Sequence, residues 1–185
     1  METLRDLFQF VVDTYPARKV LLRTRAGKGF RELTVREFET ATRDAAGRLS
    51  KAGVKPGDRI ALFAENRPEW HVIDFACYLL GAVNVPIYAT LPASQVAYIV
   101  ADCGADILLV SGRERTRTAQ DAIRGLPGIR LVGIDQGLAD GVEGLADLPK
   151  PGRRERIEPP RLTIPVVRFA VIGIYGNRTP AWIVK

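Results

Sequence analysis

The first fifty residues alternate between helical and extended patterns of apolar side chains. Apolar residues recur at three- and four-residue spacing over 2–15, which predicts an amphipathic helix. Two short extended runs follow, "KVLLRTR" and "GFREL", and the "AGKG" tetrapeptide (26–29) between them predicts a hairpin turn. "TVRE" (34–37) has the form of a capping box, so a second helix is expected to begin there and to end at Gly53.

Strand and helix patterns then alternate along the chain. "RIALFA" is a nearly continuous apolar run, typical of a strand that is covered on both faces. Pro68 suits the first turn of the following helix, which is predicted over 69–80 as a buried helix with Asn66 as its cap. "AVNVPIY" predicts the next strand, and its Pro86 implies an edge, a bulge or the end of the strand.

The same alternation continues with a helix that Pro92 opens, the strand "DILLV", a helix over 116–126 and the strand "IRLVGI". This order predicts an α/β fold, with a mostly parallel sheet and flanking helices. The expected organisation is an α/β domain over 1–148, a Pro- and Arg-rich linker over 149–165, and a divergent tail over 166–185 that could form one strand.

Composition narrows the class of protein. The 185 residues are 46% hydrophobic and 26% charged, as in a soluble globular domain. No apolar run reaches about 18 residues, so no transmembrane segment is expected, and acids at Glu2, Asp6 and Asp13 argue against a signal peptide. A cytoplasmic location is therefore predicted. Cys77 and Cys103 lie in apolar segments and are expected to be reduced core thiols; a disulfide or metal pair is the minor alternative.

The net charge of +6 lies mostly in the last part of the chain, because residues 111–185 hold 13 Lys and Arg residues against 8 Asp and Glu. The densest basic cluster, "PKPGRRERIEPPR" (149–161), is Pro-rich and has no aromatic residues. A nucleic-acid-binding face would place Lys and Arg side chains beside aromatic side chains. A solvated linker is therefore the better interpretation, and no nucleic-acid partner is expected.

A few isolated polar residues are candidates for catalysis or metal binding. His71 is the only histidine, so it cannot build a familiar zinc site, and a packed or boundary histidine is the favoured interpretation. Glu65 and Glu69 bracket a helix start, where helix-terminus charges are favoured over a paired-carboxylate site. Asp102 and Asp106 are expected to be solvated turn residues.

Aromatic residues and glycine-containing turns give no stronger candidate. Trp70, Tyr78 and Tyr88 could line a cofactor pocket, but aromatic residues in apolar elements usually belong to the core. "AGKG" is similar to part of a phosphate loop, yet it lacks the upstream Gly and the Ser or Thr after Lys. Motifs alone therefore assign no reaction.

Two longer patterns carry a family resemblance. "FRELTVREFE" (30–39) matches the pattern L-T-Y-x-E-L, and "LLGAVNVPIYATLPASQVAYIVADCGA" (79–105) matches a Gly-Ala-x-x-x-Pro strand with the helix that follows it. These patterns are similar to the N-terminal portion of the adenylate-forming (AMP-binding) superfamily, which includes acyl-CoA synthetases. "NRPEW" with "PIYATLPASQVAYI" looks most like the long-chain fatty-acid–CoA ligases. The resemblance covers residues 4–149.

The resemblance implies a parent reaction and a role for this region. In the family, ATP with Mg²⁺ activates a fatty acid as an acyl-adenylate, and coenzyme A then takes the acyl group as a thioester. ATP, Mg²⁺ and CoA are the cofactors implied for the parent family, and fatty acid and CoA are partners of a complete enzyme. The family's chemistry lies beyond the matched region, so the resemblance implies a scaffold: an incomplete N-terminal subdomain of the adenylate-forming fold.

The pattern departs from the family in the tail. The family places a strand that ends in Tyr before a phosphate loop of the form T-S-G-T-T-G-x-P-K-G. Here Tyr175 is followed by "GNRTPAWIVK", with one Gly, one Thr and no Pro-Lys-Gly. We therefore assign no catalytic, cofactor-binding or metal-binding residue, and we expect no cofactor for this chain itself.

Two classes of function stay open at this point. The first is an N-terminal fragment of a long-chain fatty-acid–CoA ligase, cut short or shifted in reading frame near 161–165 and inactive alone, which leaves open whether this chain is itself an enzyme. The second is a non-catalytic module that associates with a partner such as a full-length relative, or half of a split adenylate-forming enzyme.

Overall fold

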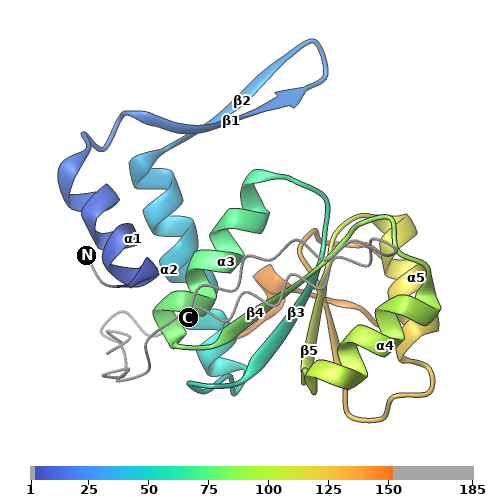
Figure 1. Cartoon of the computed structure of the whole chain (residues 1–185). Helices are drawn as coiled ribbons and strands as arrows, with labels where there is room; N and C mark the ends of the chain where they lie inside the picture. Colours follow the sequence, from blue (N-terminus) through green and yellow to red (C-terminus); the bar gives the residue numbers. More distant parts are fainter. Residues whose placement is uncertain (1–2, 152–185) are drawn as a thin grey trace, which may run out of the picture.

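The computed structural model describes residues 3–151. Figure 1 shows a long hairpin that projects from N-terminal helices on one side and a sheet between helices on the other. No helix in the described part of the chain is long and apolar enough to cross a membrane. The elements, in chain order, are α1 (Leu4–Thr14), β1 (Val20–Ala26), β2 (Gly29–Thr34), α2 (Val35–Lys51), β3 (Arg59–Phe63), α3 (Pro68–Leu80), β4 (Val83–Ile87), α4 (Ala93–Cys103), β5 (Ile107–Val110), α5 (Arg113–Ile123), β6 (Arg130–Gly133), β7 (Glu143–Gly144) and the 3₁₀ turn η1 (Leu145–Asp147).

The N-terminal predictions are confirmed. β1 and β2 pair antiparallel around the "AGKG" turn, with Ala26 opposite Gly29. The capping box at the start of α2 is complete, because the Glu37 N–H donates to Thr34 Oγ1 at 3.3 Å and the Thr34 N–H donates to Glu37 Oε2 at 2.8 Å. The hydrogen bonds that the Glu37 carboxylate accepts from the N–H and the hydroxyl of Thr34 lower its pKa.

Replacing Thr34 with alanine is expected to lower the free energy of unfolding by about 1 kcal/mol, because it removes the acceptor for an otherwise unpaired N–H of α2. Urea unfolding followed by circular dichroism measures this difference. Thr40→Ala is the matched control: the Thr40 hydroxyl donates to the Arg36 carbonyl within the helix, so its loss is expected to change stability by less than about 0.5 kcal/mol. Equal stability of the Thr34→Ala variant and the wild type would contradict the prediction.

The sheet is parallel, as predicted, and its strands lie in the order β4-β3-β5-β6-β7. β4 is an edge strand, which confirms one of the positions that Pro86 allowed. The Val83 N–H donates to the Asp58 carbonyl on the β3 side, so by alternation the nitrogen of Pro86 faces the open edge, where no N–H is needed. The two-residue strand β7 was not predicted, since two residues carry no periodic signal.

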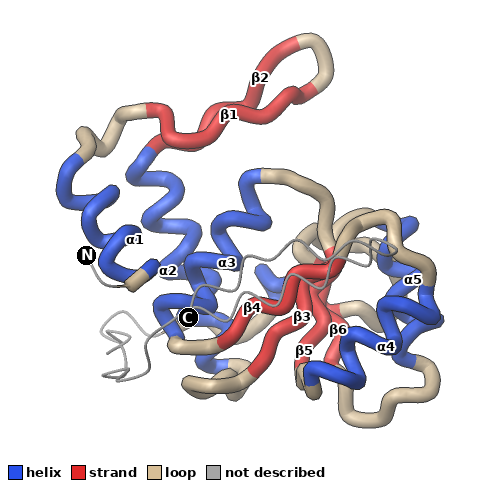
Figure 2. The backbone as a smooth tube through the Cα atoms, viewed as in Figure 1, coloured by secondary structure: helices blue, strands red, loops and turns tan. Residues whose placement is uncertain are grey.

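Each face of the sheet packs on its own pair of helices (Figure 2). Side chains of β3 alternate between the two: Ile60 and Leu62 join the core beneath α2 and α3, whereas Ala61 and Phe63 join the core beneath α4 and α5. All four are buried, as expected for a central strand that is covered on both faces.

Two helix starts differ from the predictions. Asn66 does not cap α3; the cap residue is Arg67, and it makes no side-chain cap hydrogen bond. Pro68 occupies the first helical turn as predicted, which places the cap one residue before it. α5 begins at Arg113, three residues before the predicted start, because the polar sequence "RERT" hides its first turn from a pattern of apolar residues.

The end of the described chain crosses α2. A Cβ atom at Gly47 would lie 2.5 Å from Cγ of Pro151, so only glycine allows this close approach. Beside it, the buried guanidinium of Arg48 donates from Nη1 to the carbonyl of Ala146 at 2.5 Å and to that of Leu148 at 2.8 Å. The predicted tail (166–185) and most of the predicted linker (149–165) lie outside the described residues.

Candidate functional site

The carboxyl ends of β3 and β5 are the place where this topology favours a site. The strands are neighbours, but β3 leads to α3 on one face of the sheet and β5 leads to α5 on the other. Loops that part in this way leave a crevice at the end of the sheet, and ligands of open α/β sheets commonly bind there. Here charged side chains occupy this end of the sheet. We call them the switch-point cluster, which consists of Arg31, Glu65, Arg67, Glu69, Arg115 and Asp135.

One half of the switch-point cluster joins the loop after β3 to the start of α5. The Glu65 carboxylate accepts a hydrogen bond from the buried Ser111 hydroxyl and forms an ion pair with Arg115. Arg115 also donates from Nε to the Ser111 carbonyl at 2.8 Å. Two loop residues and one residue in the first turn of α5 thus hold one another in place.

The other half is centred on Arg67. Its Nη1 and Nη2 atoms lie 2.9 and 2.8 Å from the two carboxylate oxygens of Asp135, which follows β6. Its Nε atom donates to Oε2 of Glu69 at 2.8 Å, and its Nη1 atom lies 3.6 Å from Oε1 of Glu65. Asp135 also accepts from the Gly112 N–H at 3.1 Å, at the start of α5. Such two-pronged pairs are the strong form of the arginine–carboxylate interaction.

Hydrogen bonding outweighs burial in the titration of this cluster. Burial opposes the charged form of Arg67, yet its bonds to Asp135 and Glu69 raise its pKa above the ordinary value. Burial likewise opposes ionisation of Glu69, but bonds from Arg67 and Arg31 lower its pKa overall. Both groups are therefore fixed in their charged forms at neutral pH, so neither is poised to exchange a proton in catalysis.

The switch-point cluster is internally neutral and fully paired. Three arginines, including Arg31 on the hairpin, face three carboxylates, and ion pairs join every one of them to an opposite charge. Among residues 3–151, no group of three or more His, Cys, Asp or Glu residues could hold a metal ion. This arrangement of ion pairs holds the loops at the carboxyl end of the sheet together.

The structure places the acidic candidates in two different settings. Glu69 lies in the first turn of α3, as the helix-terminus interpretation requires, but Glu65 and Glu69 also belong to the switch-point cluster, which was not predicted. Asp102 and Asp106 are exposed, as expected for solvated turn residues.

The remaining candidates sit in or near the core. His71 is half-buried and its ring meets the Trp70 ring edge-on at 5.3 Å, which confirms a boundary histidine. Tyr78 is half-buried, but Tyr88 is 56% exposed, so the core interpretation is wrong for Tyr88. Tyr88 follows the last residue of β4, the edge strand of the sheet.

Both cysteines are free thiols, as predicted. Cys77 is fully buried and Cys103 is half-buried, with its Sγ 3.4 Å from the Val100 carbonyl. Burial raises the pKa of both thiols above the ordinary value, so neither is activated as a nucleophile.

A second polar group lies between α3 and β4. Asn84 Nδ2 donates to Asp74 Oδ1 at 2.7 Å, while Asn84 Oδ1 is buried without a hydrogen-bond partner. Burial raises the pKa of Asp74, and burial together with the Asp74 charge raises that of Tyr78. No local sequence pattern indicates this group, because Asp74 and Asn84 are ten residues apart and lie on two different elements.

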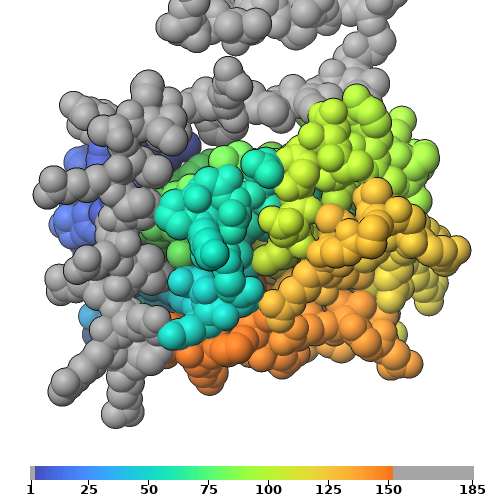
Figure 3. All heavy atoms as spheres, turned by 90° about the horizontal axis from the view of Figure 1, so that it is seen from below, coloured from blue at the N-terminus to red at the C-terminus, as the bar shows by residue number. Residues whose placement is uncertain are grey.

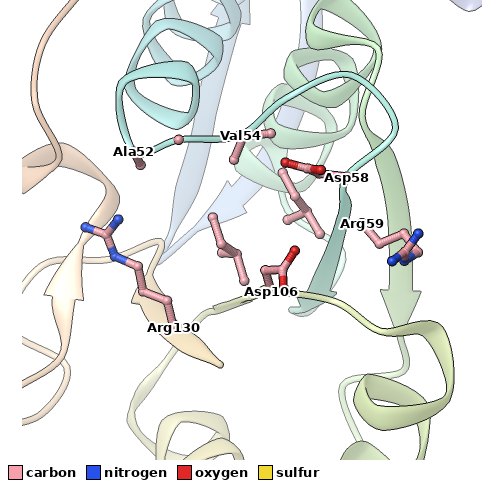
Figure 4. Close-up of a pocket in the computed structure, with 9 residues that line it drawn as sticks. Ala52, Val54, Asp58, Arg59, Asp106 and Arg130 are labelled. Atoms are coloured by element: carbon pink, nitrogen blue, oxygen red, sulfur yellow. The ribbon is translucent and has the colours of Figure 1, made fainter. Parts of the chain in front are cut away.

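A hollow of about 300 Å³ opens at the opposite, amino end of the strands. In Figure 4, Arg130 lies on one side of it and Arg59 on the other, with Asp58 and Asp106 between them. Arg59 donates to the Gly104 carbonyl and Arg130 pairs with Glu143, so both cations are already engaged. Figure 3 views this end, where the teal loop before β3 lies beside lime and orange segments.

Comparison with known proteins decides the family. A family model described as "AMP-binding enzyme" matches residues 8–156, most of the chain. The chain belongs to this family. The other AMP-binding sequences that it resembles include the long-chain-fatty-acid–CoA ligase FadD15 of Mycobacterium bovis, which is 35% identical over 101 residues covering 55% of this chain and 17% of that protein. Long-chain-fatty-acid–CoA ligase 1 of Cavia porcellus is 26% identical over 201 residues, covering 99% of this chain and 29% of that protein.

Solved structures of AMP-binding enzymes share the fold. A long-chain-fatty-acid CoA ligase from Rhodopseudomonas palustris matches with a TM-score of 0.67 at 23% identity, over 78% of this chain and 35% of that one. The anthranilate CoA ligase AuaEII matches with a TM-score of 0.66 at 28% identity, over 76% of this chain and 27% of that one. This chain thus spans about a third or less of the length of the ligases that it matches.

Proposed function

We propose that this chain provides the N-terminal scaffold of a long-chain fatty-acid–CoA ligase and does not activate fatty acids by itself. The observation that carries the proposal is the match of residues 8–156 to the AMP-binding family, together with relatives that are long-chain-fatty-acid–CoA ligases. ATP, Mg²⁺ and CoA are cofactors of the parent reaction in this proposal, and the chain acts in the cytoplasm.

The chemistry of the chain supports the second half of the proposal. A triphosphate needs several convergent N–H groups together with Lys, Arg or Mg²⁺ to offset its charge. In the described residues, the arginines at the switch point are each paired with carboxylates, and the "AGKG" turn offers a single Lys at the tip of a hairpin. "GNRTPAWIVK" in the tail likewise lacks the glycine spacing of a phosphate loop.

The test measures palmitate-dependent exchange of labelled pyrophosphate into ATP. The isolated chain is expected to give no exchange above background, because no preorganised donors stabilise the adenylation transition state. Exchange that saturates with palmitate would show that it contains a complete site.

A chimera tests the scaffold role directly. Residues 4–149 would replace the corresponding region of Mycobacterium tuberculosis FadD15, which is 34% identical over 101 residues. The chimera is expected to retain palmitate-dependent exchange, whereas FadD15 without that region is expected to lose it. A folded chimera with no exchange would contradict the proposal that this region is equivalent to a ligase scaffold.

Association with a full-length relative stays a prediction. It is supported by the hairpin, which projects from the body of the molecule (Figure 1) and carries Phe30 with 66% of its surface exposed. An isolated two-stranded hairpin is marginally stable in water, so a partner surface would stabilise it.

A further inference from the structure

The β1–β2 hairpin is fastened to the body mainly at its base. There Leu33 is buried and Leu22 packs on the core beneath α2 and α3, and the Val35 N–H donates to the Lys19 carbonyl at 2.9 Å. Farther out, the hairpin side chains are mostly exposed, and the ribbon extends away from the sheet (Figure 1). The orientation of the outer half therefore depends on whatever contact it makes beyond its own two strands.

That contact comes from Arg31. Its Nη1 atom lies 2.5 Å from Oε1 of Glu69, a residue 38 positions later at the start of α3. The other carboxylate oxygen of Glu69 accepts a hydrogen bond from Arg67. Arg67 in turn donates to the carboxylate of Asp135, which follows β6. One line of ion pairs thus runs from the hairpin, through the start of α3, to the loop at the carboxyl end of the sheet.

The geometry of Glu69 makes this line a linkage rather than a set of separate pairs. Each of its two oxygens serves a different arginine, so the carboxylate cannot turn toward one arginine without weakening its bond to the other. Arg67 is likewise shared between Glu69 and Asp135. If Asp135 loses its charge, Arg67 is expected to bind the remaining carboxylates more strongly, in competition with Arg31 for Glu69. Charged groups that share partners in this way show non-additive energies.

We propose that Glu69 couples the orientation of the β1–β2 hairpin to the switch point of the sheet, so that a change at Asp135 is transmitted to the hairpin. The linkage gives the fold a physical route between a crevice where α/β proteins bind ligands and a projecting surface.

Native-state hydrogen exchange on the full 185-residue chain tests the coupling. Asp135→Asn keeps the shape of the side chain and removes its charge, and the hairpin amides are expected to exchange roughly three- to tenfold faster than in the wild type. Glu143→Gln is the matched control, because it removes a carboxylate that pairs with Arg130 away from the linkage. This control is expected to leave hairpin exchange unchanged, and the amides of β3 are expected to stay protected in both variants.

A double variant decides whether the effect of Asp135 reaches the hairpin through the Arg31–Glu69 pair. Arg31→Ala should speed hairpin exchange by itself, and adding Asp135→Asn should then change it no further. Unchanged hairpin exchange in Asp135→Asn would overturn the proposal, as would an equal acceleration in the presence and absence of Arg31.

Salt dependence gives a second readout that needs no change at Asp135. Between about 0.02 and 0.5 M NaCl, hairpin exchange should accelerate more in the wild type than in Arg31→Ala, since salt screens the Arg31–Glu69 pair only in the wild type and the Arg23–Glu32 pair across the hairpin in both. Equal salt sensitivity of the two proteins would also overturn the proposal.

Discussion

Replacing Arg48 with alanine is expected to lower the free energy of unfolding by about 3 kcal/mol. The Arg48 side chain is 7% exposed, and its guanidinium donates to the carbonyls of Ala146 and Leu148 and pairs with Asp44 at 2.6 Å. Hydrogen bonds from a charged donor are strong, and removing this donor leaves two carbonyls without their partner. Alanine is a good helix former, so the loss reports the tertiary contacts rather than the helix.

Chemical denaturation at neutral pH measures this difference. Arg124→Ala is the control: the Arg124 side chain is 81% exposed and pairs with Asp121 on the surface, so its removal is expected to cost less than about 0.5 kcal/mol. If Arg48→Ala and Arg124→Ala are equally stable, Arg48 does not anchor the segment 146–148 to α2. Arg48→Lys should fall between the wild type and Arg48→Ala, because a lysine keeps the charge and loses the planar fork.

Local signals in the sequence predicted the elements that depend on neighbouring residues. The capping box at Thr34, the "AGKG" hairpin and the strand "RIALFA" all arise from spacings of a few residues, and the structure confirms each. Pro86 predicted an edge, a bulge or the end of a strand, and the structure shows the first of these, because a missing N–H is tolerated where no ladder partner is present.

The switch-point cluster could not be predicted in the same way, because its pairs join residues far apart in the chain. Arg67 and Asp135 are 68 positions apart, and only the order of the strands brings them together. One usable signal was present: Glu65, Ser111 and Asp135 each come directly after a predicted strand. The carboxyl ends of parallel strands share one edge of the sheet, so this position alone would have grouped them.

Replacing Arg67 with alanine is expected to lower the free energy of unfolding by about 2 kcal/mol near neutral pH. The Arg67 side chain is 20% exposed and holds Asp135 and Glu69 in the same cluster, so its loss leaves neighbouring carboxylates to repel one another. The cost stays below that of a fully buried pair because Glu69 keeps Arg31, Glu65 keeps Arg115, and Asp135 keeps the N–H at the start of α5.

The same variant should reveal its cause through pH. The pKa of Glu69 in the folded protein is lowered from the ordinary value of 4.5, with burial opposing the shift and Arg67 the strongest bond favouring it. A lowered folded pKa gives stability that is fully present above the unfolded pKa and is lost as pH falls through the folded one. The difference in the free energy of unfolding between wild type and Arg67→Ala should therefore be constant well above pH 4.5 and become smaller below it. Urea unfolding at a series of pH values on both sides of 4.5 measures this difference. A gap that is unchanged by acid would mean that Arg67 stabilises the fold by packing its side chain rather than by its charge.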